Sequence, residues 1–260
     1  MRPVELNFTD SGGAGEAVVL AHAIGCDHRM WSHLVPRLAK DFRVIALDMR
    51  GHGRSPVVPR PYTLEIMADD ACLVLEKLGI AKAHWVGLSM GGMVGQAFVL
   101  RHPARLLKLV IANSTCSYGP EGRALWQSRA RQVQEGGLAA IRSTVEARYF
   151  SEEFRAREPG TVAEIMDRFM QTPVEGYLGC CDAIAKLDYA DDLIRAKSKT
   201  LVIAGELDAG TPPAMSEAIA AKIPGARMAT IAAAAHLSAV EKPGEFARLV
   251  EEFLPERVPA

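Results

Sequence analysis

One serine lies in a setting that suits a nucleophile. The segment Gly87-Leu88-Ser89-Met90-Gly91-Gly92 follows an apolar run, residues 83–86, and precedes a helical pattern, residues 93–100. In such a G-x-S-x-G turn between a strand and a helix, the serine hydroxyl is exposed and the glycines leave room for neighbouring backbone. The alternative is a glycine-rich turn that only packs tightly. The strand-turn-helix context favours the prediction that Ser89 is the nucleophile.

A serine hydroxyl is a weak nucleophile and needs a neighbouring base. In this topology the base comes last in chain order, after the acid. We predict that His236 is the base, because it follows an apparent last strand, residues 226–231, and precedes a C-terminal helix. His102 precedes a proline at a helix end and His84 opens a strand, so both are expected to be structural.

The acid that orients the histidine should follow a late strand. Asp208 fits, because it lies in the loop after the apolar run Thr200–Ala204. It would hold His236 in the correct tautomer and stabilise its charged form. Glu206 is the rival, but Asp208 lies deeper in the loop, just before Thr211. We expect Thr211 to cap the next helix, with Pro212 at the first helical position.

Two backbone N–H groups are expected to stabilise a developing oxyanion. One belongs to Met90, directly after the serine, and the other to Ile24, in the loop after the strand at residues 17–22. Losing one such donor typically lowers the rate ~100–1000-fold. The alternative for the Ile24 segment is an ordinary turn.

Elements that could position these residues alternate along the chain. Near-continuous apolar runs are typical of strands covered on both faces, and their alternation with helical patterns predicts a mostly parallel sheet flanked by helices. We expect the first residues, Val4–Phe8, to form an antiparallel hairpin with the strand at 17–22. Thr63 is expected to cap a helix that ends at Gly79. The remaining predicted strands are residues 43–47, 83–86, 107–112, 200–204 and 226–231.

The middle of the chain, residues 118–186, contains no strand-like run. Apparent capping boxes begin at Thr161 and Thr172, so we expect a helical insertion that serves as a lid. The predicted domains are therefore a core of residues 1–117 and 187–260 and a lid of residues 118–186. Extra helical packing without a role is the alternative for this stretch.

Composition excludes several classes of protein. The 260 residues carry 30 basic and 31 acidic side chains, for a net charge of −1, so no global field attracts nucleic acid or an anionic membrane. No apolar run approaches the ~20 residues of a membrane span. The five cysteines match no zinc site and are expected to be reduced thiols. We expect a soluble, cytoplasmic protein that needs no metal and no organic cofactor.

Five segments together resemble the α/β-hydrolase superfamily: Ala21–Gly25, Asp48–Ser55, Gly87–Gly92, Gly205–Asp208 and Ala235-His236. The glycine-rich DMRGHGRS turn at residues 48–55 is expected to tie loops together through its Asp and Arg. A narrower resemblance is to the 3-oxoadipate enol-lactonases. It is carried by Val4–Gly13, Gly87–Gln96, the Glu175–Cys181 segment with its double cysteine, and Ala235–Pro243. The chain departs from the usual pattern at Ala21–Gly25 and at Ala239, where members often carry Ser-Asn-Ser-Leu-Gly and Asn.

The resemblance implies hydrolysis of a small carboxylated lactone in aromatic catabolism. The substrate carboxylate would need a local cationic partner, and the first half of the lid, residues 122–150, has a net charge of +3. Arg129 and Arg148 are our candidates because guanidinium binds carboxylate bidentately, with Trp126 packing on the apolar part of the substrate. Solvated surface arginines are the alternative. A general carboxylesterase, another lactonase, or a binding protein on a hydrolase scaffold also fits the sequence.

Overall fold

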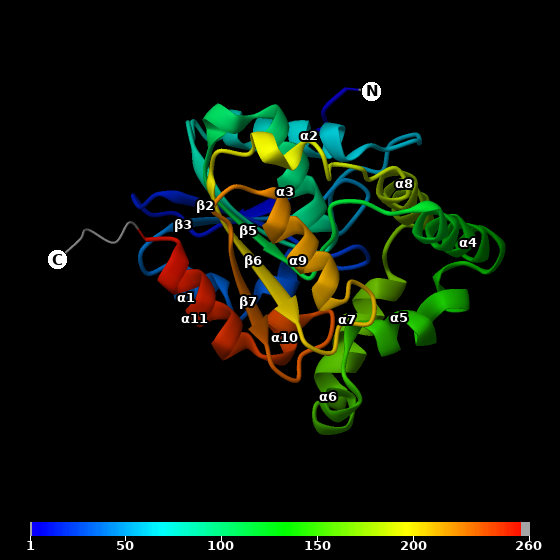
Figure 1. Cartoon of the computed structure of the whole chain (residues 1–260). Coiled ribbons are helices and arrows are strands. Elements are labelled where there is room, and N and C mark those ends of the chain that lie inside the picture. The colour runs from blue at the N-terminus through cyan, green and yellow to red at the C-terminus, as the bar shows by residue number, and fades with distance from the viewer. Residues whose placement is uncertain (1, 256–260) are drawn as a thin grey trace.

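A seven-stranded sheet runs through the centre of the computed structural model, which describes residues 2–255 (Figure 1). The strand order is β1-β3-β2-β4-β5-β6-β7, and every pairing except β1 with β3 is parallel. The central strands β2 and β4 are buried along their whole length, as expected for strands covered on both faces. The strands are β1 (Phe8–Asp10), β2 (Ala17–Ala21), β3 (Arg43–Leu47), β4 (Ala83–Leu88), β5 (Leu106–Ala112), β6 (Lys199–Gly205) and β7 (Arg227–Ile231).

The predicted N-terminal hairpin is wrong. Strand β1 pairs antiparallel with β3, with Phe8 opposite Leu47, and does not pair with β2. The reason is that both edges of β2 are occupied by the parallel strands β3 and β4. The first strand instead adds at the outer edge of β3, where Asp10 forms an ion pair with Arg43.

Helices cover both faces of the sheet (Figure 1). Helices α1 (Val35–Leu38) and α11 (Pro243–Phe253) lie together on one face and are joined by the Arg37–Glu251 ion pair. Helices α2, α3 and α9 lie on the other face. As predicted, the Thr63 hydroxyl caps α2 by accepting from the Ile66 N–H. These helices and the short ones of the core are α2 (Leu64–Lys77), α3 (Met90–Arg101), α9 (Pro213–Lys222), α10 (Ser238–Glu241), η1 (His28–Trp31), η2 (Pro103–Arg105) and η4 (Leu193–Arg195).

The predicted helical insertion lies between β5 and β6. Its helices gather at one side of the molecule, next to the ends of β6 and β7 (Figure 1). The two ends of the insertion meet at an antiparallel bridge between Ser117 and Asp188. The insertion contains α4 (Pro120–Gly136), η3 (Leu138–Ile141), α5 (Arg142–Tyr149), α6 (Glu152–Arg157), α7 (Pro159–Met170) and α8 (Val174–Ile184).

The capping boxes predicted in the insertion do not form. Helix α7 begins at Pro159, so Thr161 lies inside its first turn, and α8 begins at Val174 directly after Pro173. Neither helix has a side-chain cap. Proline at the first helical position has a suitable φ and lacks the N–H that would stay unpaired there, so α7 starts two residues before the predicted cap.

Within residues 2–255, no helix is both long enough and apolar enough to cross a membrane. All five cysteines lie in this range as free, buried thiols. Burial raises the pKa of Cys26 and Cys181 to about 12, which keeps both as unreactive thiols.

Candidate active site

Ser89 stands in a strained turn between β4 and α3. Its backbone has φ 56° and ψ −115°, a conformation that costs a non-glycine residue ~1–3 kcal/mol. The tight turn depends on Gly87 and Gly91. A Cβ atom on Gly87 would overlap the Gly91 carbonyl, and one on Gly91 would overlap the Ala21 carbonyl. The strained turn thus places the Ser89 hydroxyl beyond the end of β4.

The structure brings Ser89, His236 and Asp208 into one hydrogen-bonded row. The Ser89 Oγ lies 2.9 Å from His236 Nε2, and His236 Nδ1 lies 2.8 Å from Asp208 Oδ2. All three residues are buried; Ser89 is only 4% exposed. With Asp208 accepting at Nδ1, the neutral imidazole has its free lone pair at Nε2, facing the serine hydroxyl. His236 Nε2 is therefore placed to take a proton from Ser89 Oγ.

Asp208 is held as a carboxylate by its surroundings. Burial alone would raise the pKa of Asp208, but the facing His236 and the hydrogen bonds from His236 and Thr211 hold it well below its usual range. Its Oδ1 accepts from the Gly210 and Thr211 N–H groups, and its Oδ2 accepts from the Asn113 amide at 3.0 Å. These donors fix the direction in which the carboxylate can orient His236.

The rival acid, Glu206, points elsewhere. It is exposed, and its carboxylate accepts from the Ala233 N–H at 2.8 Å. The predicted helix cap at Thr211 is also wrong, because α9 begins only at Pro213. The Thr211 hydroxyl donates instead to Asp208 Oδ2 at 2.7 Å. Thr211 therefore supports the acid rather than the helix.

The two expected oxyanion donors lie on adjoining segments. Met90 is the first residue of α3, so its N–H has no acceptor one turn earlier in the helix. The Gly91 N–H donates to the His22 carbonyl at 3.1 Å, which joins the first turn of α3 to the loop that contains Ile24. This contact holds the Met90 segment beside the loop that contains Ile24.

The three substrate-binding candidates form a cluster in the insertion, which we call the arginine cluster (Trp126, Arg129 and Arg148). The guanidinium carbons of Arg129 and Arg148 lie 4.8 Å and 5.7 Å from the ring centre of buried Trp126. Arg148 also packs against Gly210, where any Cβ atom would overlap its guanidinium. Since Gly210 is two residues after Asp208, this contact sets the cluster beside the acid loop.

Several residues near the site carry no sequence motif. Asn113, at the end of β5, donates to Asp208, and it accepts from the Ser238 hydroxyl at 2.5 Å. Tyr149, at the end of α5, stacks on His236 with ring centres 6.0 Å apart and an interplanar angle of 20°. Both positions depend on contacts between segments far apart in sequence. The positive φ of 47° at Asn113 is visible only in the folded backbone.

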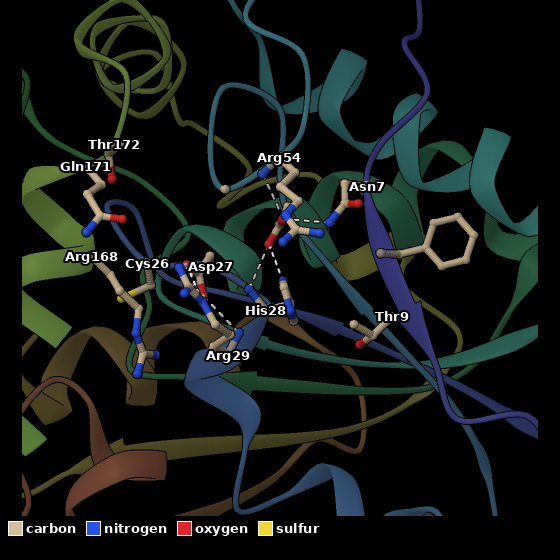
Figure 2. Close-up of a pocket in the computed structure, with 13 residues that line it drawn as sticks. Asn7, Thr9, Cys26, Asp27, His28, Arg29, Arg54, Arg168, Gln171 and Thr172 are labelled. Carbon is tan, nitrogen blue, oxygen red and sulfur yellow. Dashed lines mark hydrogen bonds and ion pairs between the residues drawn. The ribbon is translucent and has the colours of Figure 1, made fainter. Parts of the chain in front are cut away.

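A cavity of about 440 Å³ lies between the insertion and the core. Figure 2 shows Arg168, Gln171 and Thr172 of the insertion on one side and Asp27 and Arg29 of the core on the other. Its charged side chains pair largely with one another: Arg29 holds both oxygens of Asp27. The carboxylates that line this cavity, Asp27 and Asp48, thus already have partners.

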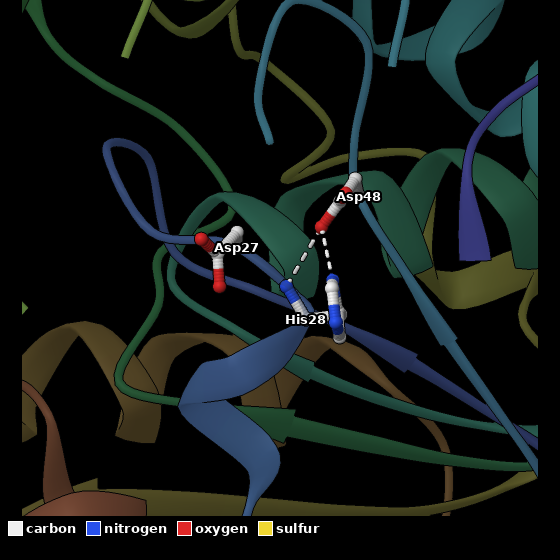
Figure 3. Close-up of side chains that lie close together, drawn as sticks. All are labelled: Asp27, His28 and Asp48. Carbon is white, nitrogen blue, oxygen red and sulfur yellow. Dashed lines mark hydrogen bonds and ion pairs between the residues drawn. The ribbon is translucent and has the colours of Figure 1, made fainter. Parts of the chain in front are cut away.

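Three side chains in this cavity, Asp27, His28 and Asp48, are close enough to suggest a cation site. Their oxygens are occupied by donors. His28 donates to one Asp48 oxygen from its N–H and its ring Nδ1, as Figure 3 shows, while Asn7 and the Arg54 N–H donate to the other oxygen. A cation would have to displace these bonds, so the donor set does not fit a metal. Asp48 instead ties loops together, as the sequence predicted.

The chain is similar to known proteins along most of its length. A family model described as the alpha/beta hydrolase fold matches residues 16–243. A 3-oxoadipate enol-lactonase of Acinetobacter baylyi is 33% identical, with 96% of this chain and 93% of that protein covered.

Two solved structures are also similar along nearly the whole chain. The enol-lactonase from Burkholderia xenovorans is 35% identical, with a TM-score of 0.92 and 96% of each chain covered. A thermophilic esterase from Thermogutta terrifontis, solved with malate bound, is 32% identical, with a TM-score of 0.90, and 96% of this chain and 92% of that chain are covered.

Proposed function

The chain belongs to the α/β-hydrolase fold family, and from this premise we propose that it is a serine hydrolase that opens a small carboxylated lactone of the 3-oxoadipate enol-lactone type. The observation that carries the proposal is the hydrogen-bonded row of Ser89, His236 and Asp208 at the ends of the strands. Residues 1–117 and 187–260 would form the catalytic core, and residues 118–186 the lid.

Acylation uses the groups of the triad in sequence. Ser89 Oγ attacks the lactone carbonyl while His236 Nε2 takes its proton, and Asp208 stabilises the imidazolium that forms. The negative charge on the carbonyl oxygen is met by the N–H groups of Met90 and Ile24. The C–O bond of the ring then breaks, and the leaving enol oxygen takes the proton from His236. The enol converts to its ketone, which makes ring opening favourable.

Deacylation uses a water molecule as the nucleophile, with His236 again as the base. His236 takes a proton from water, the hydroxide attacks the acyl carbon, and Ser89 leaves with the proton. Each step moves one proton between oxygen and His236, so the proposed chemistry requires no metal and no organic cofactor.

The arginine cluster supports recognition of an acidic substrate. Within residues 2–255 neither Arg129 nor Arg148 forms an ion pair, so both guanidiniums can donate to a substrate carboxylate. Tyr177 has a buried hydroxyl that faces the Arg129 guanidinium and donates to no acceptor among the described residues. Burial raises the pKa of Tyr177, which keeps this hydroxyl protonated and able to donate. The related Thermogutta esterase, solved with malate, is similar to this chain and holds a small dicarboxylate.

A second candidate function is hydrolysis of simple carboxylic esters. It is favoured by the 32% identity to that same esterase along 96% of this chain. The triad serves both functions equally well, because substrate choice depends on the residues that surround it.

Turnover on a panel of lactones and esters separates the two candidates. The panel contains the 3-oxoadipate enol-lactone, a lactone of similar size without a carboxylate, and a neutral short-chain ester. We expect kcat/KM to be highest for the carboxylated lactone. Activity on the neutral ester together with none on the enol-lactone would favour the esterase, and inactivity on the whole panel would contradict both.

A further inference from the structure

The peptide unit between Ile24 and Gly25 is held from two directions. Its carbonyl oxygen accepts a hydrogen bond from the hydroxyl of Tyr149, which is at the end of α5 in the insertion. Its N–H donates to His52 Nε2 at 2.9 Å, in the core. A peptide plane fixed at both its oxygen and its N–H cannot rotate freely, so Ile24 is locked in one backbone orientation.

The preceding peptide unit carries the N–H expected to face the oxyanion. Its carbonyl, that of Ala23, lies 2.7 Å from His22 Nδ1, while His22 Nε2 accepts from the Met49 N–H at 2.8 Å. Because Nε2 accepts, the proton of neutral His22 is on Nδ1 and is donated to the Ala23 carbonyl. Burial lowers the pKa of both His22 and His52, which keeps both rings neutral as these bonds require.

Three side-chain hydrogen bonds thus hold these two peptide units. His22 and His52 of the core make two of them, and Tyr149 makes the third. Tyr149 is also attached to the base. Its ring stacks on the His236 imidazole, and its backbone carbonyl accepts from the Leu237 N–H at 2.9 Å. It is 2% exposed, and Phe169 packs edge-on against its ring.

The next turn of the insertion is anchored to the same segment. Buried Glu241 accepts from the N–H and hydroxyl of Ser151 at 3.0 Å and 2.7 Å, and from the Ala235 N–H at 3.1 Å. This carboxylate fixes the chain around Tyr149 relative to the loop that carries His236. The loop that carries His236 thus fixes the position of Tyr149, whose ring stacks on that histidine.

We infer that Tyr149 is a positioning residue for the reaction: its hydroxyl aligns the oxyanion loop through the Ile24 carbonyl, and its ring holds the face of His236. This inference rests on the proposed function. The hydroxyl contributes by keeping the Ile24 N–H aimed at the oxyanion, because without it the Ile24 carbonyl loses its partner and the peptide plane can turn. A direct donor is worth ~100–1000-fold in rate, so we expect misalignment to cost about 10–100-fold.

The test is the rate of Ser89 labelling by a fluorophosphonate probe, which needs the nucleophile and the oxyanion donors but not the natural substrate. We expect Tyr149→Phe to lower the second-order labelling rate constant about 10–100-fold. The fraction of protein finally labelled should stay near that of the wild type. A purely structural defect would lower the labelled fraction instead and leave the rate constant of the remaining molecules unchanged.

Tyr62→Phe is the matched control. Tyr62 is also fully buried and its hydroxyl donates to a backbone carbonyl, that of Val58, at 2.9 Å. We expect this variant to label at the wild-type rate. Tyr149→Met, which lacks both hydroxyl and ring, should label more slowly than Tyr149→Phe, and it keeps the test open if one variant folds poorly.

Steady-state kinetics on the best substrate of the panel provide a second readout. A positioning role predicts a fall in kcat with KM within about twofold. Labelling of Tyr149→Phe within twofold of wild type and of Tyr62→Phe would overturn the inference while leaving the proposed function intact. A wild-type protein that the probe does not label at Ser89 would instead overturn the proposed function.

Discussion

The triad and the arginine cluster differ in how their polar groups are held. Asp208 accepts hydrogen bonds from five donors, and both nitrogens of His236 have partners. Arg129 and Arg148 instead lie over the face of Trp126 and, within residues 2–255, form no ion pair. A site whose polar groups are all hydrogen-bonded is fixed in geometry. Arginines without an ion pair are instead available to bind a ligand. We therefore expect the core to determine the reaction and the insertion to determine which substrate binds.

Removal of the nucleophile should have the largest effect. We expect Ser89→Ala to lower kcat by about 10⁴-fold or more on every substrate of the panel, because no other group can form the acyl-enzyme. The measurement is kcat together with fluorophosphonate labelling, and thermal unfolding checks that the variant is folded. Labelling at the wild-type rate in this variant would place the nucleophile elsewhere.

Replacement of the acid should be nearly as severe. Asp208→Asn keeps the shape but favours the wrong tautomer of His236, and we expect kcat to fall about 10⁴-fold. Glu206→Gln is the control, since Glu206 faces Ala233 and should leave kcat within about twofold. Equal losses in the two variants would break the assignment of Asp208 over Glu206.

Replacement of the cluster arginines should affect binding of acidic substrates selectively. A hydrogen bond to a charged group is worth ~1.5–3 kcal/mol, so Arg129→Ala and Arg148→Ala should each raise KM for the carboxylated lactone about 10–100-fold. KM for the neutral ester should change little. Arg131→Ala, an exposed arginine of the same helix α4, is the control. Unchanged KM in both cluster variants would exclude these residues from carboxylate binding.

The smallest effect concerns stability rather than turnover. Burial lowers the pKa of His52 from 6.5 to about 3, so below pH 6.5 the unfolded chain binds a proton that the folded chain does not. Stability should therefore fall as the pH drops from 6.5 towards 3, by ~1.4 kcal/mol per pH unit, or roughly 2 kcal/mol by pH 5.

The check on this pH dependence is urea unfolding at pH 5 and pH 7 of the wild type and His52→Gln. Glutamine can still accept from the Gly25 N–H but does not titrate, so it should weaken the pH dependence. Exposed His33→Gln serves as the control and should keep it. An unchanged pH dependence in His52→Gln would contradict the expected contribution of this ring.

The two regions also differ in how far the sequence predicted them. The triad could be proposed from local signals, because a G-x-S-x-G turn and the ends of parallel strands fix where such residues meet. The arginine cluster was suggested only by an excess of charge. Tyr149 was not predicted, because its contacts with Ile24 and His236 join three segments that are distant in sequence. No local pattern encodes such a meeting.

The wrong predictions have local physical reasons. The N-terminal strand was assigned to the neighbour that follows it in sequence, but both edges of that neighbour are taken by parallel strands. The caps were placed at threonines, but the helices begin at or just after prolines. Thr211 was available to Asp208 for that reason.

The bridge between Ser117 and Asp188 closes the insertion into a loop whose ends leave and rejoin the core at one point. Strands β5 and β6 pair directly beneath it, so the sheet does not depend on the length of what lies between them. Doubling the length of such a loop costs only ~0.6 kcal/mol of closure entropy. The whole insertion could therefore be exchanged for another helical segment to change substrate selectivity. A graft would need to bring its own hydrogen-bond donor to the Ile24 carbonyl.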